Sequence, residues 1–262
     1  HGIVIGAVDV QRSDWDCTLE PTGGGGKGFV VRMGLRYVKG LNGEDGQRVV
    51  AQRPAGGYRS IDTFAAESGI NSLGLSRLAE CGALETLKGK RRDALWEVLG
   101  TRQGQAEHLQ LEITEGATHF RELDDFETIH WDYELMSHSP RGHPLVPLRD
   151  ELTRMRLPDA AVVRNMQDGV RVHYAGMVIC RQRPGTAKGV VFMTLEDETG
   201  FVNLVIWERV YQAHRLLAKT ATLLGVTGKL QSDGGVTHIV ADRLWTPKIS
   251  TQPARRKSRD FH

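Results

Sequence analysis

The sequence lacks several features that would point to a particular class of protein. Its three cysteines (Cys17, Cys81 and Cys180) are far apart and form no CxxC or CxxH spacing. A disulfide framework or a zinc knuckle is therefore not expected. No apolar run approaches the length of about 18–20 residues that a membrane span needs, and no signal peptide is recognisable. Together these absences predict a protein of the reducing cytoplasm.

The chain also has almost no excess of charge of either sign. It contains 34 lysines and arginines against 32 aspartates and glutamates, a formal net charge of +2. That excess neither requires nor excludes a nucleic-acid partner, and what matters is whether the positive charge is clustered. With 40% hydrophobic residues in a length of 262, the chain can form real cores. Two domains are expected rather than one.

Carboxylates in a metal-binding arrangement are a further feature that the sequence does not show. Catalysis with two metal ions needs acidic side chains that hold the ions ~4 Å apart. Asp9, Asp14 and Asp16 surround a turn and are predicted to cap it or to accept hydrogen bonds. The acidic residues within 124–127 stand at a predicted helix start, where the helix dipole favours them. We therefore expect no catalytic site and no metal or other cofactor in this chain.

What is present forms five successive segments. The chain begins at His1 without a methionine, which indicates a piece of a longer protein. Strand patterns dominate from residue 170 to 245, with a helix-like stretch between the third and fourth of five strands, which is the plan of an OB-fold barrel. The predicted segments are a strand-like opening (1–32), a helical domain (33–100), a connector with short helices (101–168), an OB-fold domain (169–247) and a basic tail (248–262). The predicted fold class is thus a multidomain α+β protein.

Two glycine turns in the helical segment predict tandem helix-hairpin-helix elements. In the first, Val38–Gly43, glycines permit a tight turn and a close approach of the backbone to DNA, and the following helix offers N–H groups to a phosphate. The second, Cys81–Leu84, contains less glycine and is followed by a group of basic residues. A hairpin without a ligand is the alternative for both. The predicted duplex contacts are Lys39, Gly40, Asn42, Gly43, Lys88, Lys90 and Arg91.

Side-chain alternation predicts which barrel residues face outward. Val191, Met193 and Leu195 share one face of the second strand and are assigned to the core, which leaves Phe192 outside. The same argument places Trp207 outside on the third strand. Exposed rings on these two strands suit stacking with the bases of single-stranded DNA, unless another domain covers them. The predicted single-strand contacts are Arg181, Arg183, Lys188, Phe192 and Trp207.

At this point the chain resembles a known family. The stretch Thr186–Gly200 is similar to the OB-fold signature of bacterial replicative DNA polymerase α subunits, with Glu196–Gly200 at the turn between strands two and three. Any one motif alone is weak, but the ordered set is specific and covers essentially the whole chain. The motifs that resemble the error-prone, DnaE-type branch of this family more closely are Asp9-Val10 with Ser13–Glu20, Arg141–Leu145 and Ser258–His262.

The resemblance implies that the chain is the C-terminal part of an error-prone DNA polymerase. In that family a PHP domain, palm, thumb and fingers come first, so residues 1–32 would end the fingers. The full-length enzyme would be a nucleotidyltransferase that uses Mg²⁺ and acts in translesion synthesis during induced mutagenesis. Its expected partners are duplex and single-stranded DNA, and the sliding clamp or mutagenesis accessory proteins.

Two other functions compete with this one. Replicative α subunits carry a clamp-binding peptide that ends in Phe, whereas Gln110–Thr114 at that place lacks the aromatic residue, so recruitment through a partner protein is the expectation. The main alternative is a protein-docking module in which Phe192 and Trp207 form a binding hot spot. A fragment of a DNA ligase or tRNA synthetase is disfavoured, because NAD-type ligases place the barrel before the hairpins and carry zinc cysteines.

Overall fold

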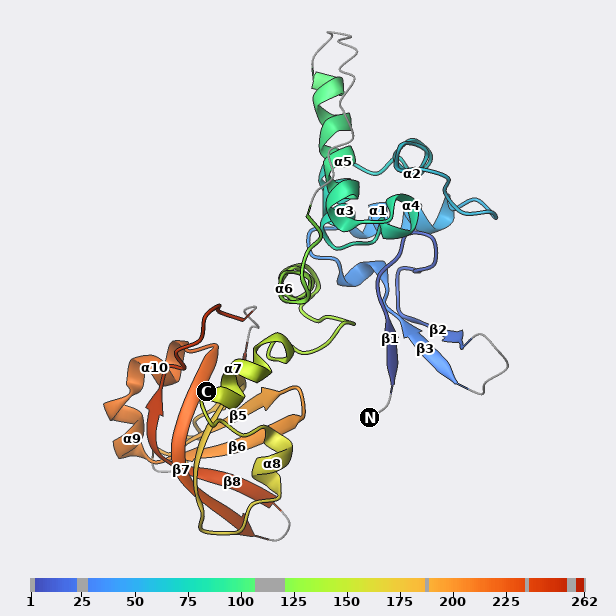
Figure 1. Ribbon diagram of the computed structural model, residues 1–262. Coiled ribbons are helices and arrows are strands. Elements are labelled where there is room, and N and C mark those ends of the chain that lie inside the picture. Colours follow the sequence, from blue (N-terminus) through green and yellow to red (C-terminus); the bar gives the residue numbers. More distant parts are fainter. Residues whose placement is uncertain are drawn as a thin grey trace. The chain divides into compact units, whose positions relative to one another are not determined.

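The computed structural model describes residues 3–22, 28–106, 121–186, 189–233, 236–253 and 258–261. The chain divides into two units, His1–Pro140 and Arg141–His262 (Figure 1). Each unit has its own hydrophobic core. The predicted α+β class is confirmed, since helical hairpins form most of the first unit and a β-barrel forms most of the second. The division at residue 140 assigns the two halves of the expected connector to different units. In the described part of the chain, no helix has the length and apolar character to cross a membrane.

The first unit opens with a small three-stranded sheet. Strand β1 (Val4–Gly6) pairs in parallel with β3 (Phe29–Arg32), and β2 (Thr18–Pro21) pairs antiparallel with β3. The Arg32 guanidinium holds the sheet to the following turn, because it donates to the Ala7 carbonyl (2.7 Å) and to the Glu20 carboxylate (2.9 Å). This arginine lowers the pKa of Glu20.

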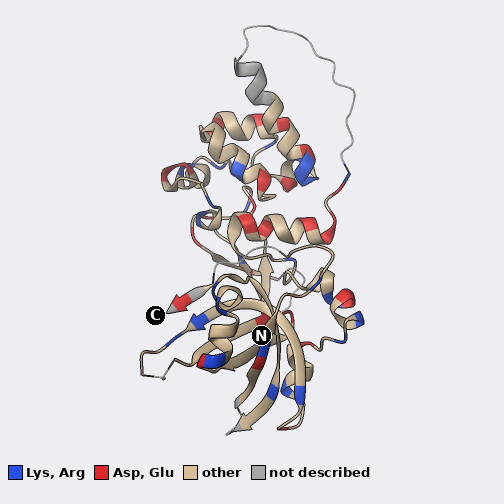
Figure 2. Ribbon diagram, turned by 90° about the vertical axis from the view of Figure 1, so that its left-hand side faces the viewer, with Lys and Arg blue, Asp and Glu red and all other residues tan. Residues whose placement is uncertain are grey.

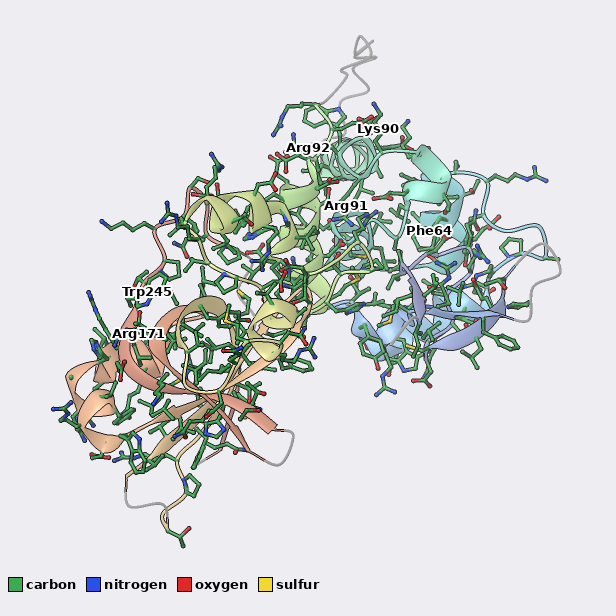
Figure 3. The ribbon with its side chains drawn as sticks, turned by 60° about the horizontal axis from the view of Figure 1, so that its bottom comes forward. Phe64, Lys90, Arg91, Arg92, Arg171 and Trp245 are labelled. Carbon is green, nitrogen blue, oxygen red and sulfur yellow. The ribbon has the colours of Figure 1, made fainter. Side chains whose placement is uncertain are left out.

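Helices complete the first unit. The side chains of Val10, Leu35, Phe64 and Leu78 are all fully buried in one cluster, so the boundary expected between residues 32 and 33 lies inside a single core. Phe64 is labelled in Figure 3. The helices in the described residues are η1 (Leu35–Tyr37), α1 (Gly43–Ala51), α2 (Ile61–Ser68), α3 (Ser72–Glu80), α4 (Glu85–Lys88), α5 (Arg91–Ala106) and α6 (Asp125–Met136).

The acidic residues considered for metal binding have structural partners. Asp9 accepts a backbone N–H two residues further on (2.9 Å), which confirms its predicted role in the turn. Asp14 and Asp16 each form an ion pair with an arginine. Asp124 is the N-cap of α6 and forms a capping box with Glu127, as the helix-start interpretation predicts.

The second unit is a closed five-stranded barrel. Strand β5 pairs antiparallel with β4 and β6, β7 pairs antiparallel with β4 and β8, and a parallel β6–β8 pairing completes the ring. This is the predicted OB-fold plan, with the expected helix formed as two short ones. The elements are η2 (Val146–Leu148), α7 (Arg149–Arg154), α8 (Ala160–Arg164), β4 (Arg171–Gln182), β5 (Val191–Asp197), β6 (Gly200–Ile206), α9 (Glu208–Ala213), α10 (Arg215–Thr220), β7 (Leu223–Asp233), β8 (Val236–Trp245) and β9 (Arg259–Phe261).

A buried carboxylate organises the turn between β5 and β6. Asp197 is almost fully buried and accepts hydrogen bonds from the Thr199 N–H (2.8 Å), the Ala160 N–H at the start of α8 (2.7 Å) and the Tyr174 hydroxyl (3.1 Å). Burial, followed by the nearby Asp197 charge, raises the pKa of Tyr174. Because Ala160 joins the barrel core, this carboxylate fixes α8 to the barrel and explains the acidic signature at residues 196–200.

Candidate nucleic-acid interface

Two similar glycine turns lie against each other in the first unit. Gly40-Leu41-Asn42 precedes α1, and Gly69-Ile70-Asn71 precedes α3. Both glycines have positive φ, 83° and 57°, a region that glycine enters without the steric cost of a side chain. Both asparagines cap the following helix by accepting a backbone N–H. The Asn71 amide also donates to Asp45 of α1 at 2.5 Å, so the two turns form one paired hairpin surface.

The two hairpins differ in charge at the helix that follows. The first turn of α1 contains Glu44, which is exposed, and Asp45. The first turn of α3 contains no acidic residue and exposes Ser72 and Leu73. A phosphate at a helix N-terminus is favoured by free N–H groups and by the helix dipole, and it is opposed by a carboxylate in the same place. The start of α3 is therefore the better phosphate site of the two.

The hairpin predicted at Cys81–Leu84 is an internal turn. Gly82 has φ 82°, but Ala83 and Leu84 are fully buried, and the Ala83 carbonyl accepts the Val10 N–H at 3.0 Å. The hairpin at 69–71 was missed by sequence reasoning. The signal that finds it is the shared pattern of glycine, an aliphatic residue and asparagine at 40–42 and 69–71.

The side-chain cations predicted to bind duplex DNA already have partners in the structure. Lys39 donates to the Glu134 carbonyl at 2.7 Å, at the C-terminal end of α6. Lys88 pairs with Glu97 and Lys90 pairs with Glu122; these hydrogen-bonded carboxylates raise the pKa of both lysines. Figure 2 shows both basic and acidic positions among the helices of the first unit. Of the predicted contacts, Gly40 and Asn42 are exposed and Gly43 is half-buried.

Arg91 has a clear structural role. Its side chain is only 4% exposed, and its guanidinium lies 2.6 Å from the Asp132 carboxylate, 3.0 Å from the Cys81 carbonyl and 3.3 Å from Glu85. Asp132 is itself fully buried. Figure 3 labels Arg91 between Lys90 and Arg92 at the start of α5. A phosphate contact by Arg91 would break this buried pair, so the interface proposed below omits it.

The barrel presents an aromatic face on β5 and β6. Val191, Met193 and Leu195 are buried as predicted, whereas Phe192 and Trp207 are 38% and 56% exposed, so the predicted alternation is confirmed. Phe192 lies opposite Val205 in the register. Trp207 was expected on β6, but this strand ends at Ile206, and Trp207 directly follows it as the N-cap residue of α9.

The aromatic face extends beyond the predicted pair. Phe201, opposite Glu196 on β5, is 53% exposed. Between the rings, Thr194 and Asn203 are opposite each other and joined by a 3.0 Å hydrogen bond. We define the aromatic face by the outward residues Phe192, Thr194, Glu196, Phe201, Asn203, Val205 and Trp207.

The predicted cations at the edge of this face differ from one another. Arg183 is 43% exposed on its side chain, pairs with Glu208 at 3.0 Å and lies 4.8 Å above the Tyr211 ring. Arg181 is mostly buried and donates to the Ala218 carbonyl at 2.8 Å and to the Ser258 hydroxyl at 2.5 Å. It therefore joins α10 to the C-terminal segment. Lys188 lies outside the described residues.

Comparison with protein families matches a model in each unit, and the two matches together point to nucleic-acid binding. A helix-hairpin-helix motif matches residues 2–94, and an OB-fold nucleic acid binding domain matches residues 172–246. Each match covers the part of the chain where the structure has the corresponding fold. The chain therefore combines two modules of a nucleic-acid-binding protein.

Curated relatives narrow the class further. The chain is 41% identical to the error-prone DNA polymerase of Alkalilimnicola ehrlichii and 38% identical to that of Aromatoleum aromaticum, in both cases over 100% of this chain and 25% of the relative. It thus spans about a quarter of their length, and it matches the C-terminal quarter of DnaE-type error-prone DNA polymerases. The family resemblance read from the sequence is confirmed. Among solved structures, asparaginyl-tRNA synthetase from Pyrococcus horikoshii matches 39% of this chain and 24% of its own with a TM-score of 0.30 at 21% identity, which is too weak to carry an argument.

Proposed function

We propose that this chain is the DNA-handling C-terminal part of an error-prone DNA-directed DNA polymerase that acts in translesion synthesis. The paired hairpins bind phosphates of the duplex, and the aromatic face of the barrel binds the single-stranded template. The observation that carries the proposal is the row of exposed rings on β5 and β6, in a domain whose family model describes nucleic-acid binding. Residues 1–32 would end the fingers of the full-length enzyme. Its Mg²⁺ would be held outside this chain, and its work on the bacterial chromosome would place it in the cytoplasm.

At the hairpins, the proposed contacts come from backbone groups. The N–H groups around Asn42 and Asn71 stand at exposed turns before nine-residue helices. Such contacts read the position of phosphates and not the base sequence, which suits an enzyme that must copy any template. We infer that the start of α3 is the stronger of the two contacts, because its first turn contains no acidic residue and the nearby Asp45 carboxylate is buried and already accepts from Asn71 and Arg48.

At the barrel, the proposed contact is stacking. Each base stacked on an aromatic ring contributes about 1–3 kcal/mol without regard to sequence. We expect Phe192→Ala to weaken binding of a single-stranded oligonucleotide about 5–150-fold, which corresponds to that range. Fluorescence anisotropy over a salt series measures it, with Phe201→Ala as a second test of the same face. Duplex binding should be unchanged in both variants.

A protein-docking function is favoured by one observation. The only charged residue of the aromatic face is Glu196, a carboxylate that repels phosphates. The sliding clamp or a mutagenesis accessory protein is the candidate ligand for an apolar face of this kind, and large aromatic residues are typical hot spots. If Phe192→Ala leaves DNA affinity unchanged and abolishes capture of a purified clamp or accessory protein, docking is the function of this face.

A further inference from the structure

A pocket lies on strands of the barrel that do not carry the aromatic face. It has a volume of about 600 Å³, and its walls come from β4, β7, β8, the end of α7 and the chain just after β8. This size suits a small ligand or one unit of a polymer. The polar and aromatic residues of its lining include Arg156, His173, Thr227, Arg243, Trp245 and Lys248.

The indole of Trp245 is fixed in position within this pocket. Its Nε1–H donates to the Thr227 hydroxyl at 3.2 Å, and that hydroxyl also lies 2.9 Å from Nδ1 of His173. A Cβ added at Gly225 would meet three carbons of the six-membered ring almost equally closely. A point placed in that way lies over the ring face, so the indole rests flat on the Gly225 backbone. The half-buried ring still lines the pocket.

Three cations line the same pocket as the indole. Arg156, Arg243 and Lys248 are all exposed, and within the described ranges no carboxylate forms an ion pair with any of them. Arg156 has φ 57° at the residue where α7 gives way to the next segment. Glycine is the usual residue in that conformation because a side chain makes it costly. An arginine there suggests that its side chain has a use.

Positive charge continues from the pocket along the neighbouring strands. His173 lies opposite Thr227, and Arg171 lies opposite Lys229 two positions away. Arg171 pairs with Asp242 at 3.2 Å, whereas Lys229 is exposed. Arg171 and Trp245 are both labelled on the barrel in Figure 3. The arrangement is a fixed aromatic ring in a pocket with three exposed cations, with Lys229 exposed on a neighbouring strand.

We propose that this pocket is a second site for single-stranded nucleic acid, in which one base stacks on Trp245 and Arg156, Arg243 and Lys248 bind the adjacent phosphates. An aromatic platform beside a positively charged groove is the combination by which single strands are held without sequence preference. An acidic peptide would use the cations alone, whereas a nucleotide would also use the part of the indole that remains exposed beside the Leu152–Leu157 cluster on which it packs. The proposal rests on the proposed function only in taking nucleic acid as the ligand, since it uses different strands from the aromatic face.

Photocrosslinking locates the ligand directly. The 262-residue chain is irradiated with oligothymidylate that carries 5-iododeoxyuridine, digested with trypsin and analysed by mass spectrometry. Trypsin separates the two sites, because Trp245 falls in peptide 244–248 and the rings of the aromatic face fall in peptide 189–209. We expect crosslinks in both peptides. Crosslinks in 189–209 alone would overturn the second site and leave the proposed function standing.

Charge removal tests the phosphate contacts. Arg156→Ala with Arg243→Ala should weaken oligothymidylate binding at least fivefold. The pair should also reduce the slope of log affinity against log salt by about 1.4, since each phosphate contact on a single strand contributes about 0.7. The matched control is Arg209→Ala with Arg215→Ala, which removes the same charge from α9 and α10. Equal effects of the two pairs of substitutions would overturn the proposal. The proposal would also be overturned if oligothymidylate did not bind at the pocket and a polyglutamate peptide bound there instead. Loss of binding with Trp245→Leu but not with Phe192→Ala would support the pocket and reject the aromatic face.

Discussion

The cations predicted to bind duplex DNA in the hairpin unit differ from the cations that line the barrel pocket in whether a carboxylate pairs with them. In the hairpin unit, Lys88, Lys90 and Arg91 are each paired with a carboxylate. In the barrel unit, Arg243 and Lys248 are exposed, and the described residues supply no carboxylate to either. The difference follows from the groups that each module can offer to DNA. Hairpins can bind phosphates with backbone N–H groups, whereas a single-strand groove needs side-chain cations beside its rings.

A basic residue in a nucleic-acid-binding module does not necessarily contact the nucleic acid. Residues 88–92 are the densest basic run in the helical domain, yet each of its basic members pairs with a carboxylate of the same unit. Pairing decides whether a cation is available, and pairing is a property of the folded chain.

The largest loss of stability is expected from a substitution at Arg91. Arg91→Ala removes one member of a buried ion pair and leaves the buried Asp132 carboxylate without the guanidinium, although the Ser139 hydroxyl still donates to it. Such losses destabilise a protein by about 3–5 kcal/mol. Urea unfolding measures the change. DNA affinity of the folded variant should be unaltered.

Arg92 provides the control for that prediction. It pairs with Glu127 at 3.5 Å, and the two side chains are 30% and 29% exposed. Arg92→Ala should therefore cost about 1 kcal/mol or less. The structural role of Arg91 would be contradicted if Arg91→Ala unfolded at the same urea concentration as the wild type and bound duplex DNA more weakly.

A smaller effect distinguishes the two hairpins. Ser72→Glu places a carboxylate in the first turn of α3, where it stabilises the helix through its dipole but repels a phosphate. We expect duplex affinity to fall about fivefold at low salt, which is about 1 kcal/mol, with stability unchanged or slightly raised. Glu44→Gln, in the equivalent turn of α1, should raise duplex affinity. Anisotropy of labelled primer–template measures both affinities. A higher affinity with Ser72→Glu and a lower affinity with Glu44→Gln would show that neither helix start binds the phosphate.

Features set by neighbours in the chain could be predicted from the sequence. Alternation along β5 placed Phe192 outside and Met193 inside because successive side chains on a strand point to opposite faces. The turn at Glu196–Gly200 could be located by its motif. The structural role of Asp197 in this turn could not be predicted, because the groups that donate hydrogen bonds to it include Ala160 and Tyr174, which are distant in the chain.

The features that escaped prediction depend on long-range partners. Nothing near Arg91 shows that it pairs with Asp132, 41 residues away. Arg181 has the composition of a groove cation, but its hydrogen bonds go to carbonyls at the end of α10. The hairpin at Gly69–Asn71 was hidden for a different reason, since its turn contains a single glycine and the pattern shows only when aligned with Gly40–Asn42.

The smallest expected effect concerns acid sensitivity, and it sets Glu20 of the first unit against Glu208 of the second. The hydrogen bond from Arg32 is the largest cause that lowers the pKa of Glu20 below its usual value of 4.5. A carboxylate whose folded pKa is depressed stabilises the protein above its unfolded pKa, and that stability is lost as the pH falls through the folded pKa. Glu20→Gln should therefore lower stability at pH 7 by less than about 1 kcal/mol, and the difference from wild type should disappear toward pH 3. A hydrogen bond from Gln212 is the main cause that lowers the pKa of Glu208, but Glu208 is solvated, so Glu208→Gln should leave stability unchanged at both pH values. Urea midpoints measured between pH 7 and pH 3 test the pair, and a deficit in Glu20→Gln that does not shrink as the pH falls would show that its ion pairs with Arg32 and Arg12 are not the source.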